Sequence, residues 1–148
     1  MSKINTKVTD SVDFFKGNKP SDLTAKFGSP LYVYSEEILR QRCRDVKNLV
    51  KYPKFSVNYS AKANSNLAFL EIVHEEGLNV DAMSPGEIFV ELKAGFKPEQ
   101  IFYISNNVTA EEMKFAIDHD VLISVDSVSQ LETYGKLNPG GKIAARFN

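Results

Sequence analysis

Short apolar runs alternate with longer mixed segments along most of this chain. The runs are rich in Val, Ile and Phe and have the length of β-strands. They cover residues 55–61, 78–83, 100–105, 121–125 and 142–147. The segments between them predict helices at about residues 66–76, 85–94, 110–119 and 128–136. Each strand–helix unit takes about 20 residues, which is typical of a βα repeat.

Three of these helices are predicted to begin with the same capping chemistry. Ser84-Pro85-Gly86-Glu87 has the form of a capping box with proline at the first helical position. Thr109-Ala110-Glu111-Glu112 and Ser127-Val128-Ser129-Gln130 are two further boxes. Gly77 and Gly95 stand where the preceding helices are predicted to end. Repeated junctions of one kind support the βα interpretation.

The first 30 residues lack this repeat. Glycine and proline interrupt them at Gly17, Pro20, Gly28 and Pro30. We therefore expect residues 1–30 to form an irregular N-terminal segment. Residues 31–34 predict one short strand, and Ser35 is a candidate N-cap for a helix of about residues 36–51 that Pro53 would stop. We place the βα domain at residues 31–148.

Strands that alternate with helices predict an α/β fold with a parallel sheet. A doubly wound sheet usually carries a glycine-rich phosphate loop after its first strand, and neither G-x-G-x-x-G nor G-x-x-x-x-G-K-[ST] occurs here. We expect a partial (β/α)8 TIM-type barrel of about five parallel βα units. A complete barrel takes about 250 residues. Because the 148-residue chain stops where the fifth strand should lead into its helix, we expect it to be truncated.

Composition narrows the function classes. The chain is 43% hydrophobic and 25% charged, as in ordinary globular proteins. Its net charge of -1 gives no support for binding to nucleic acid or a membrane surface. Cys43 is the only cysteine, so no intramolecular disulfide can form, and a cytoplasmic location is expected. No apolar run approaches the length of a membrane span, and residues 1–5 do not resemble a signal peptide.

Lys62 is the candidate for chemistry. It follows the first strand of the βα array, directly before a helix, between Ala61 and Ala63. In parallel α/β folds, sites form at the carboxyl ends of the strands. Partial desolvation there would lower the pKa of the amine and make it a nucleophile toward an aldehyde such as pyridoxal phosphate (PLP). On residue type alone, a structural lysine at a strand end is the commoner case.

Two further charged residues are predicted at the same rim. Asp81 lies on the second strand, next to the first, where its carboxylate could stabilise a protonated Lys62; capping of a local turn is the alternative. Arg146 lies late in the apolar fifth strand, where a ligand anion or a carboxylate would justify its charge; exposure at a frayed, truncated end is the alternative. Glu87 is better explained by its capping box than by catalysis. We expect His74 and His119 on the solvent side of helices, and no metal-ligand spacing is present.

Four segments together resemble a known family. Tyr59-Ser60-Ala61-Lys62-Ala63-Asn64-Ser65-Asn66 is similar to the PLP-lysine motif of the fold-type III decarboxylases, and Ala-Asn after the lysine resembles the meso-diaminopimelate decarboxylases. Residues 30–34 resemble the entry strand of that family. Val80-Asp81-Ala82-Met83-Ser84-Pro85-Gly86-Glu87 is similar to its second strand and Ser-x-Gly-Glu turn. Ala145-Arg146-Phe147-Asn148 resembles the Arg-x-Asn that ends its fifth strand.

The resemblance implies PLP-dependent decarboxylation of meso-2,6-diaminopimelate to L-lysine. Lys62 would be the Schiff-base lysine, with Asp81 beside it and Arg146 in the cofactor pocket. Family members are homodimers whose N-terminal segment packs with a C-terminal β-domain. Their stacking histidine, glycine-rich phosphate loop and pyridine-nitrogen glutamate all come later than residue 148. We therefore expect the 148-residue chain alone to be nearly inactive and, with uncovered sheet edges, to self-associate.

Three alternatives remain at this point. The first is a decarboxylase of another basic amino acid, of the ornithine or arginine type, on the same fold. The second is a non-catalytic PLP-binding half-barrel protein. The third is an unrelated half-barrel in which Lys62 is structural.

Overall fold

Five parallel strands form one sheet whose spatial order follows the chain. The computed structural model describes residues 14–104 and 106–147, and the sheet order is β1-β2-β3-β4-β5, with every neighbouring pair parallel. The strands are β1 (Asn58–Ser60), β2 (Asn79–Ala82), β3 (Ile101–Ile104), β4 (Leu122–Val125) and β5 (Ile143–Ala145). The helices are α1 (Pro20–Phe27), α2 (Glu36–Lys47), α3 (Leu67–Glu75), α4 (Pro85–Lys93), α5 (Ala110–Asp118) and α6 (Val128–Leu137). Two short 3-10 turns are η1 (Ala61–Ala63) and η2 (Pro98–Gln100).

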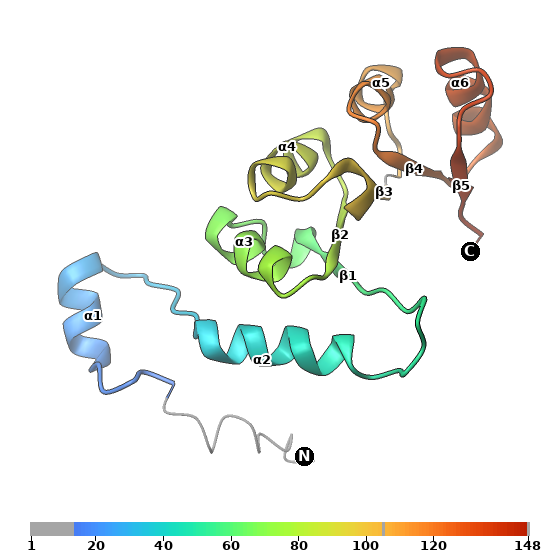
Figure 1. Ribbon diagram of the computed structural model, residues 1–148. Coiled ribbons are helices and arrows are strands. Elements are labelled where there is room, and N and C mark those ends of the chain that lie inside the picture. Colours follow the sequence, from blue (N-terminus) through green and yellow to red (C-terminus); the bar gives the residue numbers. More distant parts are fainter. Residues whose placement is uncertain (1–13, 105, 148) are drawn as a thin grey trace, which may run out of the picture.

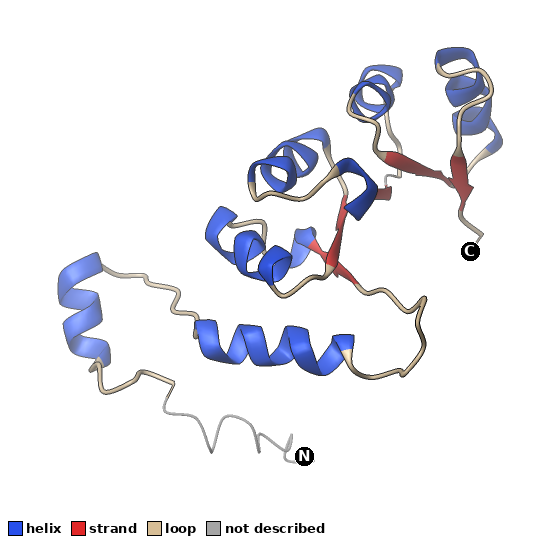
Figure 2. Cartoon of the chain, in the orientation of Figure 1, coloured by secondary structure: helices blue, strands red, loops and turns tan. Residues whose placement is uncertain are grey.

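The predicted βα repeat is confirmed. All five strands and the first three of the four helices that follow them lie within the ranges expected from the sequence, and α6 ends one residue later than expected, at Leu137. Figures 1 and 2 show α3 to α6 along one side of the sheet, with the other side bare. This is the arrangement of a barrel wall, because right-handed βαβ connections place successive helices on the same face. Within the described residues the sheet does not close.

Two expectations for the N-terminal part are wrong. Residues 20–27 form α1 instead of an irregular segment, because Pro20 starts the helix and Gly28, at φ 87°, ends it. Residues 31–34 form no strand, since no strand of the described residues pairs with them. A strand needs a partner for its backbone groups, and apolar composition alone does not supply one. Residues 1–13 lie outside the described residues.

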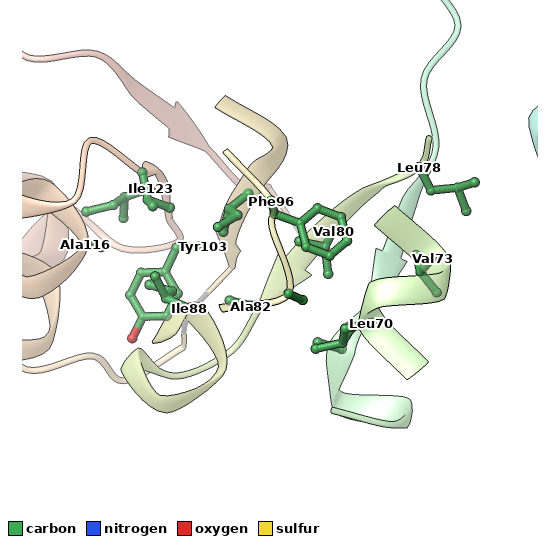
Figure 3. Close-up of a cluster of buried hydrophobic side chains, with 14 of the residues drawn as sticks. Leu70, Val73, Leu78, Val80, Ala82, Ile88, Phe96, Tyr103, Ala116 and Ile123 are labelled. Carbon is green, nitrogen blue, oxygen red and sulfur yellow. The ribbon is translucent and has the colours of Figure 1, made fainter. Parts of the chain in front are cut away.

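The core lies between the sheet and its helices (Figure 3). Burial alternates along the strands: on β2, Val80 and Ala82 are buried beneath the helices, whereas Asn79 and Asp81 are only half-buried. The same alternation places polar Asp81 on the face of the sheet that turns away from α3 and α4. Within the described residues, helices α3 to α6 cover only this one face of the sheet.

The predicted capping serines and threonine all cap their helices. Thr109 and Glu112 form the complete reciprocal box. At α4, Ser84 accepts the Glu87 N–H, but the Glu87 carboxylate accepts the N–H of Met83 at 2.6 Å instead of that of Ser84. The Gln130 side chain bonds in the same way to the residue before the cap, Asp126. These bonds tie the ends of β2 and β4 to the helices that follow.

Helix α2 is attached to α3 by an ion-pair network. Arg40 and Arg44 both bind the Glu76 carboxylate, at 3.1 and 2.7 Å, and Lys47 Nζ donates to the Glu76 carbonyl. The hydrogen bond from Arg44, together with that from Arg40, lowers the pKa of Glu76 to about 2. Cys43, on the buried side of α2, packs into the core. The network therefore holds α2 against the βα array that carries the candidate site.

Candidate active site

Lys62 lies in a tight turn at the carboxyl end of β1. The turn is η1, whose first residue, Ala61, is completely buried. The Tyr59 hydroxyl donates to the Asn64 carbonyl at 3.2 Å, and the Asn64 side chain accepts the N–H of Asn66 at 3.0 Å. Asn66 in turn caps α3 by accepting the Ala68 N–H. Buried packing on one side and these bonds on the other fix the backbone of the turn, so that the position of the Lys62 Cα is well defined.

The side chain of Lys62 is exposed, contrary to the expected desolvation. The physical reason is the bare face of the sheet, because nothing in the described residues covers the strand ends opposite the helices. No hydrogen bond or ion pair engages the Lys62 amine within residues 14–104 and 106–147. The amine is therefore available for a bond to a carbonyl group.

Asp81 lies beside the lysine turn, on the neighbouring strand. Asp81 on β2 is the ladder partner of Ser60 on β1, and the Ser60 hydroxyl donates to Asp81 Oδ1 at 2.7 Å. No ion pair joins Asp81 to Lys62 among the described side chains. The structure thus brings the two strand ends together as expected, but gives the carboxylate a hydroxyl partner that the sequence did not predict.

Arg146 lies farther along the same edge of the sheet. Its backbone N–H donates to the Val125 carbonyl at 2.8 Å, and its side chain is exposed. Because β3 and β4 separate β5 from β2, Arg146 and Asp81 stand roughly 14 Å apart along the sheet, counting about 4.8 Å per strand. The structure places all three predicted residues at carboxyl strand ends, but brings only Lys62 and Asp81 onto adjacent strands. Asn148, the last residue of the resembling segment, lies outside the described residues.

A buried acid near this site was missed by the sequence interpretation. Glu91, on α4, is 0% exposed, and neither of its carboxylate oxygens has a hydrogen-bond partner in the described structure. Burial raises its pKa to about 8, and the negative charges of Glu87 and Asp81 add to the increase. Its spacing from buried Ile88, three residues earlier on the same helix face, was the available sign. At neutral pH the group is held mostly as a neutral acid.

The two histidines are half-buried, so the expected solvent-side placement is wrong. The His74 ring packs edge-on against Phe96 at 4.9 Å between centroids. The His119 ring lies 4.2 Å from that of Phe115, and its Nδ1 is 2.8 Å from the Phe115 carbonyl oxygen. An aromatic neighbour accounts for each position: Phe96, in the loop after α4, for His74, and Phe115, on α5, for His119. Neither histidine lies at the carboxyl ends of the strands.

The described ranges, 14–104 and 106–147, hold no group of three or more His, Cys, Asp or Glu side chains suited to a metal ion. None of their helices combines the length and apolar character needed to cross a bilayer. A hollow of about 420 Å³ lies beside the lysine turn, lined by Tyr32, Tyr34, Asn64, Asn66 and Phe69 among others. It borders the turn but is not lined by Lys62 itself.

Comparison with known proteins yields the same family from sequence and from structure. The family model of the pyridoxal-binding domain of pyridoxal-dependent decarboxylases matches residues 36–148. Diaminopimelate decarboxylase from Methanothermobacter thermautotrophicus is 44% identical over 130 residues, which are 86% of this chain and 30% of that protein. The Bacillus subtilis diaminopimelate decarboxylase is 36% identical over 112 residues, 74% of this chain and 26% of that protein.

Solved structures of the same kind superimpose well. Diaminopimelate decarboxylase from Helicobacter pylori, complexed with L-lysine, matches with a TM-score of 0.81 and 30% identity over 88% of this chain and 34% of that one. A Vibrio vulnificus lysine/ornithine decarboxylase, at 19% identity and a TM-score of 0.77 over 86% of this chain and 35% of that one, shares the fold. The chain thus spans about a third of the length of these relatives. It belongs to the pyridoxal-dependent decarboxylase family, through the pyridoxal-binding domain of that family.

Proposed function

We propose that this chain supplies the lysine-bearing part of a PLP-dependent decarboxylase that converts meso-2,6-diaminopimelate to L-lysine. The observation that carries the proposal is the Lys62 turn, in which a rigid backbone at a carboxyl strand end presents an amine without a partner among the described residues. The curated relatives at 36–44% identity are named diaminopimelate decarboxylases, which supports the substrate.

The residues at this edge fit PLP. Lys62 would hold the aldehyde end of the cofactor covalently through Nζ, which needs an exposed, unpaired amine such as this one. The negative Asp81 would lie beside the point of attachment, and Arg146 would place a positive charge in the cofactor pocket. When bound, PLP supplies the electron sink that lets a carboxylate leave as carbon dioxide.

The protein side of the reaction concerns protons and charge. Lys62 Nζ must lose a proton before it can bond to a carbonyl carbon, and it can return a proton later in the cycle. Asp81, with its carboxylate held by Ser60, would favour a positive charge on the nitrogen attached to the cofactor. Glu91 stays mostly neutral at pH 7 and so does not add a third negative charge behind Asp81 and Glu87.

The proposal extends to the organisation of the whole enzyme. Residues 31–148 would be the first part of the PLP-binding barrel, and residues 1–30 would pack against a β-domain. We propose a homodimer in the cytoplasm. The coverage of about a third of each relative supports a larger enzyme with further site residues.

Covalent attachment is tested by reductive labelling. The chain is incubated with PLP, reduced with borohydride and mapped by mass spectrometry. We expect the label on Lys62, and its loss in Lys62→Arg, because a guanidinium does not form the bond. Lys54→Arg, at an exposed lysine eight residues earlier, is the matched control and should keep the label. Label spread evenly over the lysines, or label retained elsewhere in Lys62→Arg, would contradict the proposal.

The substrate is tested with the full-length enzyme that contains this chain. Release of carbon dioxide is measured from meso-2,6-diaminopimelate, ornithine, arginine and lysine under the same conditions. We expect diaminopimelate to give the highest kcat/KM by at least about a hundredfold, since a site that pairs with a substrate's polar groups rejects analogues that lack them. Preference for ornithine or arginine would assign the chain to a decarboxylase of another basic amino acid.

A further inference from the structure

The Ser60 hydroxyl binds the carboxylate of a neighbouring strand instead of capping the turn that follows it. Ser60 directly precedes η1 and stands at its N-cap, where a serine oxygen ordinarily accepts a backbone N–H of the turn. Ser60 makes no such capping bond. Its hydroxyl donates to Asp81 Oδ1 at 2.7 Å. Since a hydroxyl has only one proton to give, that proton is committed to Asp81.

Asp81 depends on this bond for its orientation. Ser60 is the only hydrogen-bond partner of the Asp81 side chain within residues 14–104 and 106–147. Hydroxyl-to-carboxylate bonds of this length are among the stronger ones, and holding one oxygen restricts the side chain to one rotamer. The two residues are paired Cα neighbours in the parallel ladder, so their side chains project from the same face of the sheet. Oδ2 is left available on that face.

Ser60 also lies two residues before Lys62. The residue between them, Ala61, is completely buried and holds the turn in place. One strand end therefore carries both the amine and the group that orients the neighbouring carboxylate. A structural role for Ser60 would be served equally well by capping η1.

We propose that Ser60 is a positioning residue, which holds Asp81 so that Oδ2 faces the Lys62 nitrogen when the cofactor is attached. This inference rests on the proposed function and deepens it. The free Lys62 side chain extends into water, which screens it from Asp81, whereas the attached nitrogen would carry its positive charge at the strand ends beside that carboxylate. A fixed carboxylate therefore stabilises the attached state more than the free amine.

Labelling of Lys62 over a range of PLP concentrations and pH tests the consequence. In Ser60→Ala we expect the PLP concentration for half-maximal labelling to rise about tenfold, the lower range for a lost hydrogen bond to a charged group. The alkaline limb of the pH profile should move to lower pH, because the attached nitrogen holds its proton less firmly. Ser60→Thr, which keeps a hydroxyl, should restore both. Ser56→Ala, at an exposed serine four residues before Ser60 and outside the lysine motif, is the control and should match the unsubstituted chain.

The orientation of Asp81 is measured separately, from three-bond couplings about its χ1 in the same variants by NMR. We expect one rotamer in the unsubstituted chain and in Ser60→Thr, and rotamer averaging in Ser60→Ala. A single Asp81 rotamer in Ser60→Ala overturns the inference, whether or not Lys62 reacts. Rotamer averaging of Asp81 in Ser60→Ala that leaves the labelling of Lys62 unchanged also overturns the inference. If the unsubstituted chain takes no label on Lys62, the proposed function fails, and the couplings still decide whether Ser60 positions Asp81.

Discussion

The free energy of unfolding is expected to fall as the pH rises from about 4.5 to about 8, because of Glu91. The carboxyl group is completely buried without a hydrogen-bond partner, so folding favours its neutral form. In this interval the unfolded chain has released the proton while the folded chain keeps it. The slope from one such group is at most about 1.4 kcal/mol per pH unit. The whole interval then amounts to roughly 4–5 kcal/mol.

The direction of this effect follows from the raised pKa. Below pH 4.5 Glu91 is protonated in both states, and above about pH 8 it is ionised in both, so its contribution is level at either end. The contribution of neutral Glu91 to the free energy of unfolding is therefore fully present below pH 4.5 and is lost as the pH rises to about 8. Glu76 acts in the opposite sense and at lower pH, because its pKa is lowered to about 2.

Urea denaturation at several pH values checks the Glu91 prediction. Glu91→Gln should remove most of the slope between pH 4.5 and 8, since an amide does not titrate there. Glu91→Leu should be more stable than the unsubstituted chain at pH 8, because no charge then has to be buried. Glu132→Gln, at an exposed position on α6, should keep the full slope. A slope that persists in Glu91→Gln would show that other groups produce it.

Truncation of Leu70 is expected to cost about 3 kcal/mol of the free energy of unfolding, within the 2–5 kcal/mol usual for buried Leu→Ala changes. Leu70 is 0% exposed on α3 and belongs to the core between the helices and the sheet (Figure 3). Its removal leaves a cavity that the surrounding strands and helices fill only in part. Because α3 begins directly after the lysine turn, the site should be lost at a lower urea concentration in this variant.

Leu67→Ala provides the comparison for Leu70→Ala. Leu67 lies on the same helix and has the same side chain, but it is 43% exposed. We expect a change of about 0.5 kcal/mol or less, as at other surface positions. Both values come from urea unfolding followed by circular dichroism. Equal losses in the two variants would mean that the packing of Leu70 is not what stabilises α3.

Much of the fold could be predicted because its signals are local. Strand composition, capping residues such as Thr109 and helix-ending glycines each act over a few residues, so the βα repeat follows from the sequence. The predictions that were wrong concern segments whose structure depends on contacts with residues far away in the sequence. Residues 31–34 have strand composition but no partner strand among the described residues, and Pro20 starts a helix where the sequence suggested a break.

The candidate site divides in the same way. The sequence by itself determined that Lys62, Asp81 and Arg146 each follow or end a strand, because that depends only on the order of elements along the chain. Only the tertiary structure decided that the Asp81 carboxylate binds the Ser60 hydroxyl and that the Lys62 side chain is exposed. It also decided that Arg146 lies three strand spacings from Asp81. It also showed that Glu91 is buried without a partner. The physical reason is that hydrogen bonding and burial depend on neighbours from distant parts of the chain, which strand register and helix packing bring together.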